Sequence, residues 1–556
     1  MKSISAHYAR LLDEALQALD AQPGYGVVLE GSIAEGFGNS TSDVDFLLIE
    51  PGERTTPLIP TIIFRDGRRV EVRVRSVHQI ALEINHVLSG ISNDSSSLDG
   101  VTFDQLDRVQ RLCRSVVYRR SVGTDHLKSL VPPAAIDNAS KTWFAQLVNQ
   151  SVRCGLAMEA IEEWQEAVQW YRTAVEQGAK AWLCSQGESY LSVKWTSLQF
   201  ARLPSAHDRF ERFRDLLITP RGTNEDMRSY AIRAKILLSD FGFDLSDLEP
   251  RSVFFTRKPD TTTWQIGDRV HIVRNREEVY VLSSAARTVW RSIDFNRCAA
   301  DQLADLRSVV ARPGQCFSEF HRLGFLGLRW SNGEEVNGRS QSSSAPSTSL
   351  PVISIRGAEV GDATEDVRLV PLAPAQFAGA GIALVWANAE IENSREDAIG
   401  ALDAEQWGTF QSATRRMVRK AAMVALTANG LVPRSSNSNG LGGSSWQRRE
   451  ADEEACARMT RIPGLPGQLV QTALALEAGS PIAGREDAES ALKDVDQFVH
   501  SVRDVTGGSL FPSSFVSPAE WRETLELSYD WVRMAAFLDS AFPLDEARDL
   551  VAVSHG

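Results

Sequence analysis

The first 120 residues change repeatedly between the apolar spacing of helices and that of strands. Residues 6–21 carry an apolar stripe at helical intervals, and Pro23-Gly24 ends this predicted helix. A valine alternation runs from Arg68 to Ser76 after the hairpin turn Asp66-Gly67, which predicts a strand with one buried face. The other elements expected here are strands at 26–29, 43–49 and 60–64, helices at 78–89 and 103–118, and a polar loop at 93–99.

The rest of the chain is mostly helical in pattern. Residues 137–243 repeat apolar positions at helical spacing, and we interpret their tryptophans as core residues. Residues 252–330 instead predict two strands followed by three helices, the layout of a small winged helix. Residues 332–349 are small and polar, as in a flexible linker. The elements expected in these last parts are strands at 269–274 and 278–282, helices at 284–294, 299–306, 317–323, 406–429, 487–505 and 518–539, extended pieces at 352–355 and 383–386, and a mobile loop at 435–445.

Composition narrows the class of protein. The chain has 556 residues, which is too long for one core and suggests about three or four domains. An apolar content of 43% and a net charge of −13 are typical of a globular protein that does not bind nucleic acid non-specifically. The six cysteines form no CxxC pair and the nine histidines no HExxH spacing, so neither a disulfide framework nor a zinc site is supported. Without a signal peptide or a bilayer-length apolar run, we expect a cytoplasmic protein with no membrane partner.

One stretch combines an anion cradle with paired acids. Gly31-Ser32 follows a predicted strand and opens a short helix, whose free backbone N–H groups favour an anion. Asp43 and Asp45 lie on the next strand, where residues two apart point to the same face. Carboxylates that hold Mg²⁺ beside a phosphate cradle are what metal-assisted phosphoryl transfer requires.

This stretch resembles the nucleotidyltransferase superfamily that includes DNA polymerase beta and the aminoglycoside nucleotidyltransferases. The likeness rests on Gly31-Ser32, then Gly38, then Ser42-Asp43-Val44-Asp45. The resemblance implies an NTP, ATP by default, bound through Gly31, Ser32 and Ser42. It also implies two Mg²⁺ ions held by Asp43, Asp45 and a third acid on a neighbouring strand. Glu71 is the best candidate for that acid, because it lies on the polar face of the valine alternation; the alternative is an exposed glutamate paired with Arg73.

The helical region after this domain supplies a further candidate. A helix that ends in a glycine turn and is followed by Val193-Lys194-Trp195 resembles the helical domain of the aminoglycoside enzymes, which implies that Lys194 faces the nucleotide phosphates. A surface lysine beside a packed tryptophan is the alternative. The general base stays unassigned among three glutamates of the early helix. Those three are Glu159, Glu162 and Glu163.

Residues 265–330 resemble PqqD-like modules, which grip leader peptides in the biosynthesis of modified peptides. The likeness rests on Val279-Tyr280-Val281-Leu282, then Ala285-Ala286 and Val289-Trp290. The exposed edge of a small sheet can accept a peptide by strand addition. A generic winged helix is the alternative, and DNA reading is disfavoured because the second and third helices carry few basic groups.

Taken together, the sequence predicts an α+β protein with a small mixed-sheet nucleotidyltransferase domain, a helical domain, a winged-helix-like module and a helical C-terminal region. The expected activity is Mg²⁺-dependent transfer of NMP, by default AMP, to a peptide acceptor in modified-peptide biosynthesis. The alternatives are a small-molecule, aminoglycoside-like acceptor and a non-catalytic antitoxin or binding protein.

In the C-terminal region, one basic cluster is interpreted as a solvated helix face: Arg415, Arg416, Arg419 and Lys420. The expected boundaries are 1–125, 126–250, 251–331, a linker at 332–350, and a C-terminal domain of unknown role at 351–556.

Overall fold

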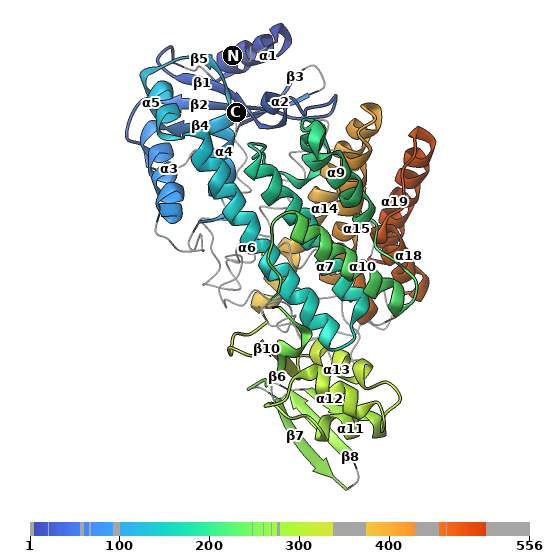
Figure 1. Ribbon diagram of the computed structural model, residues 1–556. Coiled ribbons are helices and arrows are strands. Elements are labelled where there is room, and N and C mark those ends of the chain that lie inside the picture. The colour runs from blue at the N-terminus through green and yellow to red at the C-terminus, as the bar shows by residue number, and fades with distance from the viewer. Residues whose placement is uncertain are drawn as a thin grey trace.

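The computed structural model has a sheet at one end, a helical body in the middle and a small β-rich module at the other end (Figure 1). Several sequence expectations lie outside the described residues: the turn at 66–67, the loop at 93–99, the linker beyond 336, and the elements at 352–355, 435–445 and 518–539. The described residues are 5–19, 22–55, 61–65, 68–92, 101–246, 248–259, 261–267, 269–274, 278–336, 374–428, 455–462 and 464–506.

The N-terminal sheet has five strands in the order β3-β4-β2-β1-β5. The pair β2 and β4 is parallel and the other pairs are antiparallel, so the sheet is mixed, as predicted. The central strand β2 is buried on both faces: Phe46 and Leu48 point into one hydrophobic core, and Leu47 and Ile49 point into the other. The strands are β1 (Gly26–Glu30), β2 (Val44–Glu50), β3 (Thr61–Arg65), β4 (Arg68–Ser76) and β5 (Val116–Arg119).

Helices cover both faces of this sheet. On one face α1 (Ala6–Ala18) packs its leucines against β1, β2 and β4, and on the other α3 (Val77–Ser92) and α4 (Phe103–Arg114) share a core with β1 and β2. The predicted helix at 103–118 is wrong in its last turn, because residues 116–119 form β5 against β1. Val116, Val117 and Tyr118 favour strands, and the edge of β1 supplies their hydrogen bonds.

The helical body is built on the long pair α6 (Pro133–Ala160) and α7 (Trp164–Ser185), and α10 (Asn224–Asp240) packs on α7. With 28 residues, α6 spans about 40 Å and runs from the sheet toward the module (Figure 1). The predicted core role of the tryptophans is confirmed, since four of them are buried: Trp143, Trp164, Trp170 and Trp195. The shorter helices of this region are α5 (Val122–Leu130), η1 (Val193–Trp195), α8 (Thr196–Ala201), η2 (Pro204–Ala206) and α9 (His207–Leu216).

The small module contains the two strands and three helices that the sequence predicts, together with three further strands. The sheet β7-β8-β9 is antiparallel, and β6 pairs with β10. The module and the helical body share one continuous hydrophobic core, which joins Leu237 and Leu238 of α10 to Phe255 of β6. Its elements are η3 (Pro250–Ser252), β6 (Val253–Arg257), β7 (Thr261–Ile266), β8 (Arg269–Arg274), β9 (Glu278–Val281), α11 (Ser284–Arg291), α12 (Ala299–Leu306), α13 (Pro313–Arg322) and β10 (Leu326–Trp330).

The C-terminal region is helical and packs beside the body (Figure 1). Residues 383–386, which the sequence predicts as extended, lie inside α14 (Pro374–Asp403), because the alanine-rich segment around them favours a helix over a short strand. The helices predicted at 406–429 and 487–505 are confirmed. The helices that follow α14 are α15 (Trp407–Ala428), α17 (Ala455–Arg458), η4 (Met459–Arg461), α18 (Gly467–Ala478) and α19 (Arg485–Val505). In the described part of the chain, no helix is both long enough and apolar enough to cross a membrane.

Buried charges join this C-terminal region to α7. Glu477 of α18 lies 2.6 Å from the guanidinium of Arg172 and 3.2 Å from that of Arg419, and all three residues are buried. Arg415 contacts Glu176 of α7 at 3.1 Å. The predicted solvated face is therefore wrong for Arg415 and Arg419. Burial and the neighbouring Arg172 lower the pKa of Arg415 to about 10, which still leaves it charged at neutral pH.

Candidate active site

The backbone geometry of the turn at the end of β1 requires glycine at position 31. Gly31 begins α2 (Gly31–Glu35) with a φ of +77°, and a Cβ at this position would overlap Oδ2 of Asp45. Only glycine combines this left-handed backbone with so close an approach. The helix expected after the turn is present, but it has five residues, so its dipole is small. Ser32 shapes the turn through its carbonyl oxygen, which accepts from the backbone N–H groups of Phe37 and Gly38.

Three acids lie in one row across neighbouring strands. The register places Glu30 of β1 opposite Asp45 of β2, and Asp45 beside Glu71 of β4. The structure thus brings the predicted acids Asp45 and Glu71 together and adds Glu30, which the sequence analysis did not predict. Its position as the last residue of a buried strand, directly before Gly31, could have indicated that it belongs to the site.

Asp43 stands at the entry of β2 and is held by an arginine. The guanidinium of Arg69 forms two hydrogen bonds with its carboxylate, at 2.9 Å and 2.5 Å. Such a fork is the strongest form of a carboxylate–arginine pair. Ser42, predicted to bind nucleotide, is buried. Its Oγ accepts from the backbone N–H of Asn39 and donates to Oδ1 of the same residue, both at 3.0 Å. In this arrangement Ser42 braces the loop before Asp43.

Two further arginines lie among the acids of the row. Arg73 bridges Glu30 at 2.6 Å and Glu71 at 3.3 Å. The contact with Glu71 is the pairing that the alternative interpretation expects, but Glu71 is half-buried and not exposed. Arg111 of α4 lies 3.3 Å from Asp45. The sequence reading assigned no role to Arg111, because it lies on a different element, 66 residues away.

Burial disfavours the charged form of three of these acids. Burial raises the pKa of Asp43, of Glu30 and of Glu71, and the charge of Asp45 raises that of Glu71 further. In the described residues, no three Asp, Glu, His or Cys side chains are arranged as a ready metal site. The donor chemistry still fits Mg²⁺, which prefers carboxylate oxygens, but the metal would have to replace arginine contacts.

The C-terminal helices cover the loop that leads to Asp43. The hydroxyl of Thr41 donates to the backbone oxygen of Glu396 at 2.9 Å, and Asn39 donates to the side chain of Gln406 at 3.4 Å. Gly400 packs so closely that a Cβ would overlap the side chains of both loop residues. Segments about 360 residues apart thus form one surface, and no local sequence pattern indicated it.

Helix α14 also contacts the two cations nearest Asp43. Arg69 donates to Oδ1 of Asn393 at 3.2 Å and lies 3.9 Å from Glu396. Lys194 lies 2.7 Å from Asp397, and its charge opposes the rise in the pKa of Asp43 that burial causes. Burial raises the pKa of Glu396 to about 7, opposed by Arg69 and assisted by Asp43 and Asp397. Lys194 is therefore near the predicted site, but it is held by a residue of the C-terminal region.

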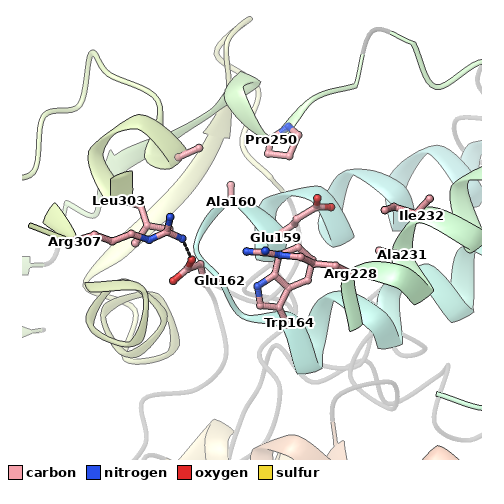
Figure 2. Close-up of a pocket in the computed structure, with 11 residues that line it drawn as sticks. Glu159, Ala160, Glu162, Trp164, Arg228, Ala231, Ile232, Pro250, Leu303 and Arg307 are labelled. Atoms are coloured by element: carbon pink, nitrogen blue, oxygen red, sulfur yellow. Dashed lines mark hydrogen bonds and ion pairs between the residues drawn. The ribbon is translucent and has the colours of Figure 1, made fainter. Parts of the chain in front are cut away.

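The three glutamates considered as general base lie elsewhere. They occupy the end of α6 and the turn after it, at the module end of the body and away from the sheet (Figure 1). Glu159 and Glu162 line a cavity of about 360 Å³ between the body and the module, where Glu162 pairs with Arg307 (Figure 2). Glu163 accepts from Ser318 of the module. This position excludes them from chemistry at Asp43.

Comparison with known proteins adds little to this geometry. No protein-family model matches the chain, and no curated protein matches it. Among solved structures, the chain is similar to a nucleotidyltransferase-like protein from Exiguobacterium sibiricum 255-15, at 14% identity over 57% of this chain and 91% of that chain. The TM-score is 0.26, so this likeness carries no conclusion about activity, and what the site can do rests on its own residues.

Proposed function

We propose that this protein is a nucleotidyltransferase that moves NMP from an NTP, by default AMP from ATP, onto an acceptor and releases pyrophosphate. The observation that carries the proposal is the row of Glu30, Asp45 and Glu71 directly beside the turn at Gly31. Carboxylates side by side on neighbouring strands, next to a backbone turn that only glycine can form, suit a metal-bound triphosphate.

The chain's own residues would act by positioning. Asp43, Asp45 and Glu71 would hold Mg²⁺, which neutralises charge on the phosphoryl group when it is bound. Gly31 leaves room for the carboxylate of Asp45 beside the turn, and the half-buried Arg69 and Lys194 supply positive charge at the entry of β2. An acceptor oxygen would attack the α-phosphorus in line, as the bond to the β-phosphate oxygen breaks and the pyrophosphate leaves.

A peptide acceptor, as in modified-peptide biosynthesis, is the second part of the proposal. Large apolar side chains lie exposed on the two outer strands of β7-β8-β9, and among the described residues each of these strands pairs with β8 only. Such a surface suits an extended apolar peptide. The module lies at the opposite end of the body from the sheet, so the modified residue would be separated from the captured segment by at least about 12 residues of extended chain (Figure 1). The exposed side chains are Trp264, Ile266, Val279 and Val281.

Calorimetric titration with each NTP, with and without Mg²⁺, tests the transferase proposal. We expect one NTP to bind wild type in the presence of Mg²⁺, and to bind the double variant Asp43→Asn/Asp45→Asn at least about tenfold more weakly. Asp403→Asn is the matched control, because Asp403 is an exposed acid at the end of α14. Wild type that binds no NTP, or binds it equally without Mg²⁺, would contradict the proposal.

A binding protein that acts by contact alone is the second candidate. The arginine contacts favour it, because Arg69, Arg111 and Arg73 already pair with the three acids that a metal would need. These are Asp43, Asp45 and Glu71, respectively. This candidate predicts no Mg²⁺-dependent heat with any NTP. The same titration therefore separates the two functions.

A further inference from the structure

One face of α14 is directed at the two cations beside Asp43. Asn393, Glu396, Asp397 and Gly400 follow the spacing i, i+3, i+4 and i+7, which places them on one side of a helix. Three of them contact a cation and the fourth packs on the loop before Asp43. A polar stripe at this spacing would more usually face solvent.

The two cations have the chemistry of a phosphate site. Arg69 presents a planar fork that can bind two phosphate oxygens, and Lys194 presents a compact ammonium group. Their side chains are 14% and 28% exposed, so both are shielded enough to bind strongly and open enough to be reached. Lys194 also lies over the ring of Trp195 at 5.1 Å, which limits its orientation.

We propose that α14 is a working part of the nucleotide site, in which Asn393 and Asp397 position Arg69 and Lys194 to bind the triphosphate. This inference rests on the proposed nucleotidyl transfer and assigns a role to the C-terminal region. Asn393 and Asp397 are positioning residues, since each acts through the cation that it contacts. Arg69 then exchanges Asp43 for phosphate oxygens while Asn393 keeps its guanidinium in place.

The packing of the C-terminal region does not by itself require these contacts. The buried pair of Arg172 and Glu477 already joins this region to α7, and Asn39 and Gln406 join it to the loop. The Asn393 contact is a single hydrogen bond at 3.2 Å to a charged group, so its loss should change the orientation of Arg69 more than the docking of the helix.

Binding of inorganic tripolyphosphate, measured by calorimetry on the full chain, is the test. We expect Asn393→Ala to weaken binding about three- to tenfold, without any change of net charge. In an Arg69→Ala background the same substitution should have no further effect, because the two residues act as one unit. Gln406→Ala is the matched control, since it removes an amide contact between the turn after α14 and the loop, and among the described contacts Gln406 has none with Arg69 or Lys194.

The other outcomes are decisive as well. Three outcomes would show that α14 contributes packing only. Binding could be unchanged in Asn393→Ala, its loss could persist in the Arg69→Ala background, or Gln406→Ala could cause the same loss. Tighter binding in Asn393→Ala would make α14 a cover that competes with the ligand, and absence of binding to wild type would remove the phosphate site; each overturns the proposal. Tripolyphosphate binding that depends on Asn393, without Mg²⁺-dependent NTP binding, would contradict the transferase, and Asn393 would then position Arg69 for a phosphate ligand that is not an NTP.

Discussion

Glu477 is the carboxylate around which the docking of the C-terminal region is built, and its replacement by alanine should loosen that region. Its side chain accepts from Arg172 at 2.6 Å, from Arg419 at 3.2 Å and from Gln169 at 3.0 Å. All four residues are buried, so water cannot replace the lost carboxylate without opening the interface. In Glu477→Ala, two guanidiniums would stay buried without this partner.

The expected loss in the free energy of unfolding follows from the burial of the ion pair. Removing one partner of a buried ion pair costs about 3–5 kcal/mol, because the other charge stays desolvated. With urea m-values of about 1–3 kcal/mol/M, the unfolding midpoint should fall by about 1–5 M. Tryptophan fluorescence reports the transition, since Trp170 lies on the same helix as Arg172 and is buried.

A matched control separates this effect from a general loss of charge. Glu489 is exposed and lies 3.6 Å from Arg485, so Glu489→Ala should change the free energy of unfolding by less than about 1 kcal/mol. A loss below about 1 kcal/mol in Glu477→Ala as well would refute the buried network as the basis of docking. Because α14 belongs to the same unit, tripolyphosphate binding should weaken in Glu477→Ala alone.

Two other predictions concern the sheet end of the protein. Gly31→Ala should cost about 1–3 kcal/mol of stability and abolish Mg²⁺-dependent NTP binding, because the new Cβ displaces Asp45. Gly24→Ala is the control, since a Cβ there meets nothing within 4 Å, and it should change neither stability nor NTP binding. The pKa of Glu396 is raised to about 7 from an ordinary value of 4.5, so wild type should lose stability as pH rises through that interval. Glu396→Gln should remove this loss and be more stable above pH 7, by about 1–3 kcal/mol in urea unfolding; identical pH profiles would contradict the assignment.

The sequence by itself determined those features that depend on neighbours along the chain. The turn at Gly31, the acids of β2 and the alternation that places Glu71 on the polar face all follow from backbone geometry over a few residues. Burial of the tryptophans followed from helical spacing in the same way. The sequence predicted the ends of helices less well than their positions. The apolar spacing of α4 ends at Leu112, and residues 116–119 form a strand because they pair with the edge of β1.

Tertiary structure alone decided which charges meet. Arg111 reaches Asp45 from another helix, and Arg415 and Arg419 are buried because Glu477 lies opposite them. Likewise α14 reaches the loop before Asp43 from far along the chain. Ion pairs and hydrogen bonds depend on distances of a few ångströms between side chains, and sequence spacing determines such distances only within one helix or strand.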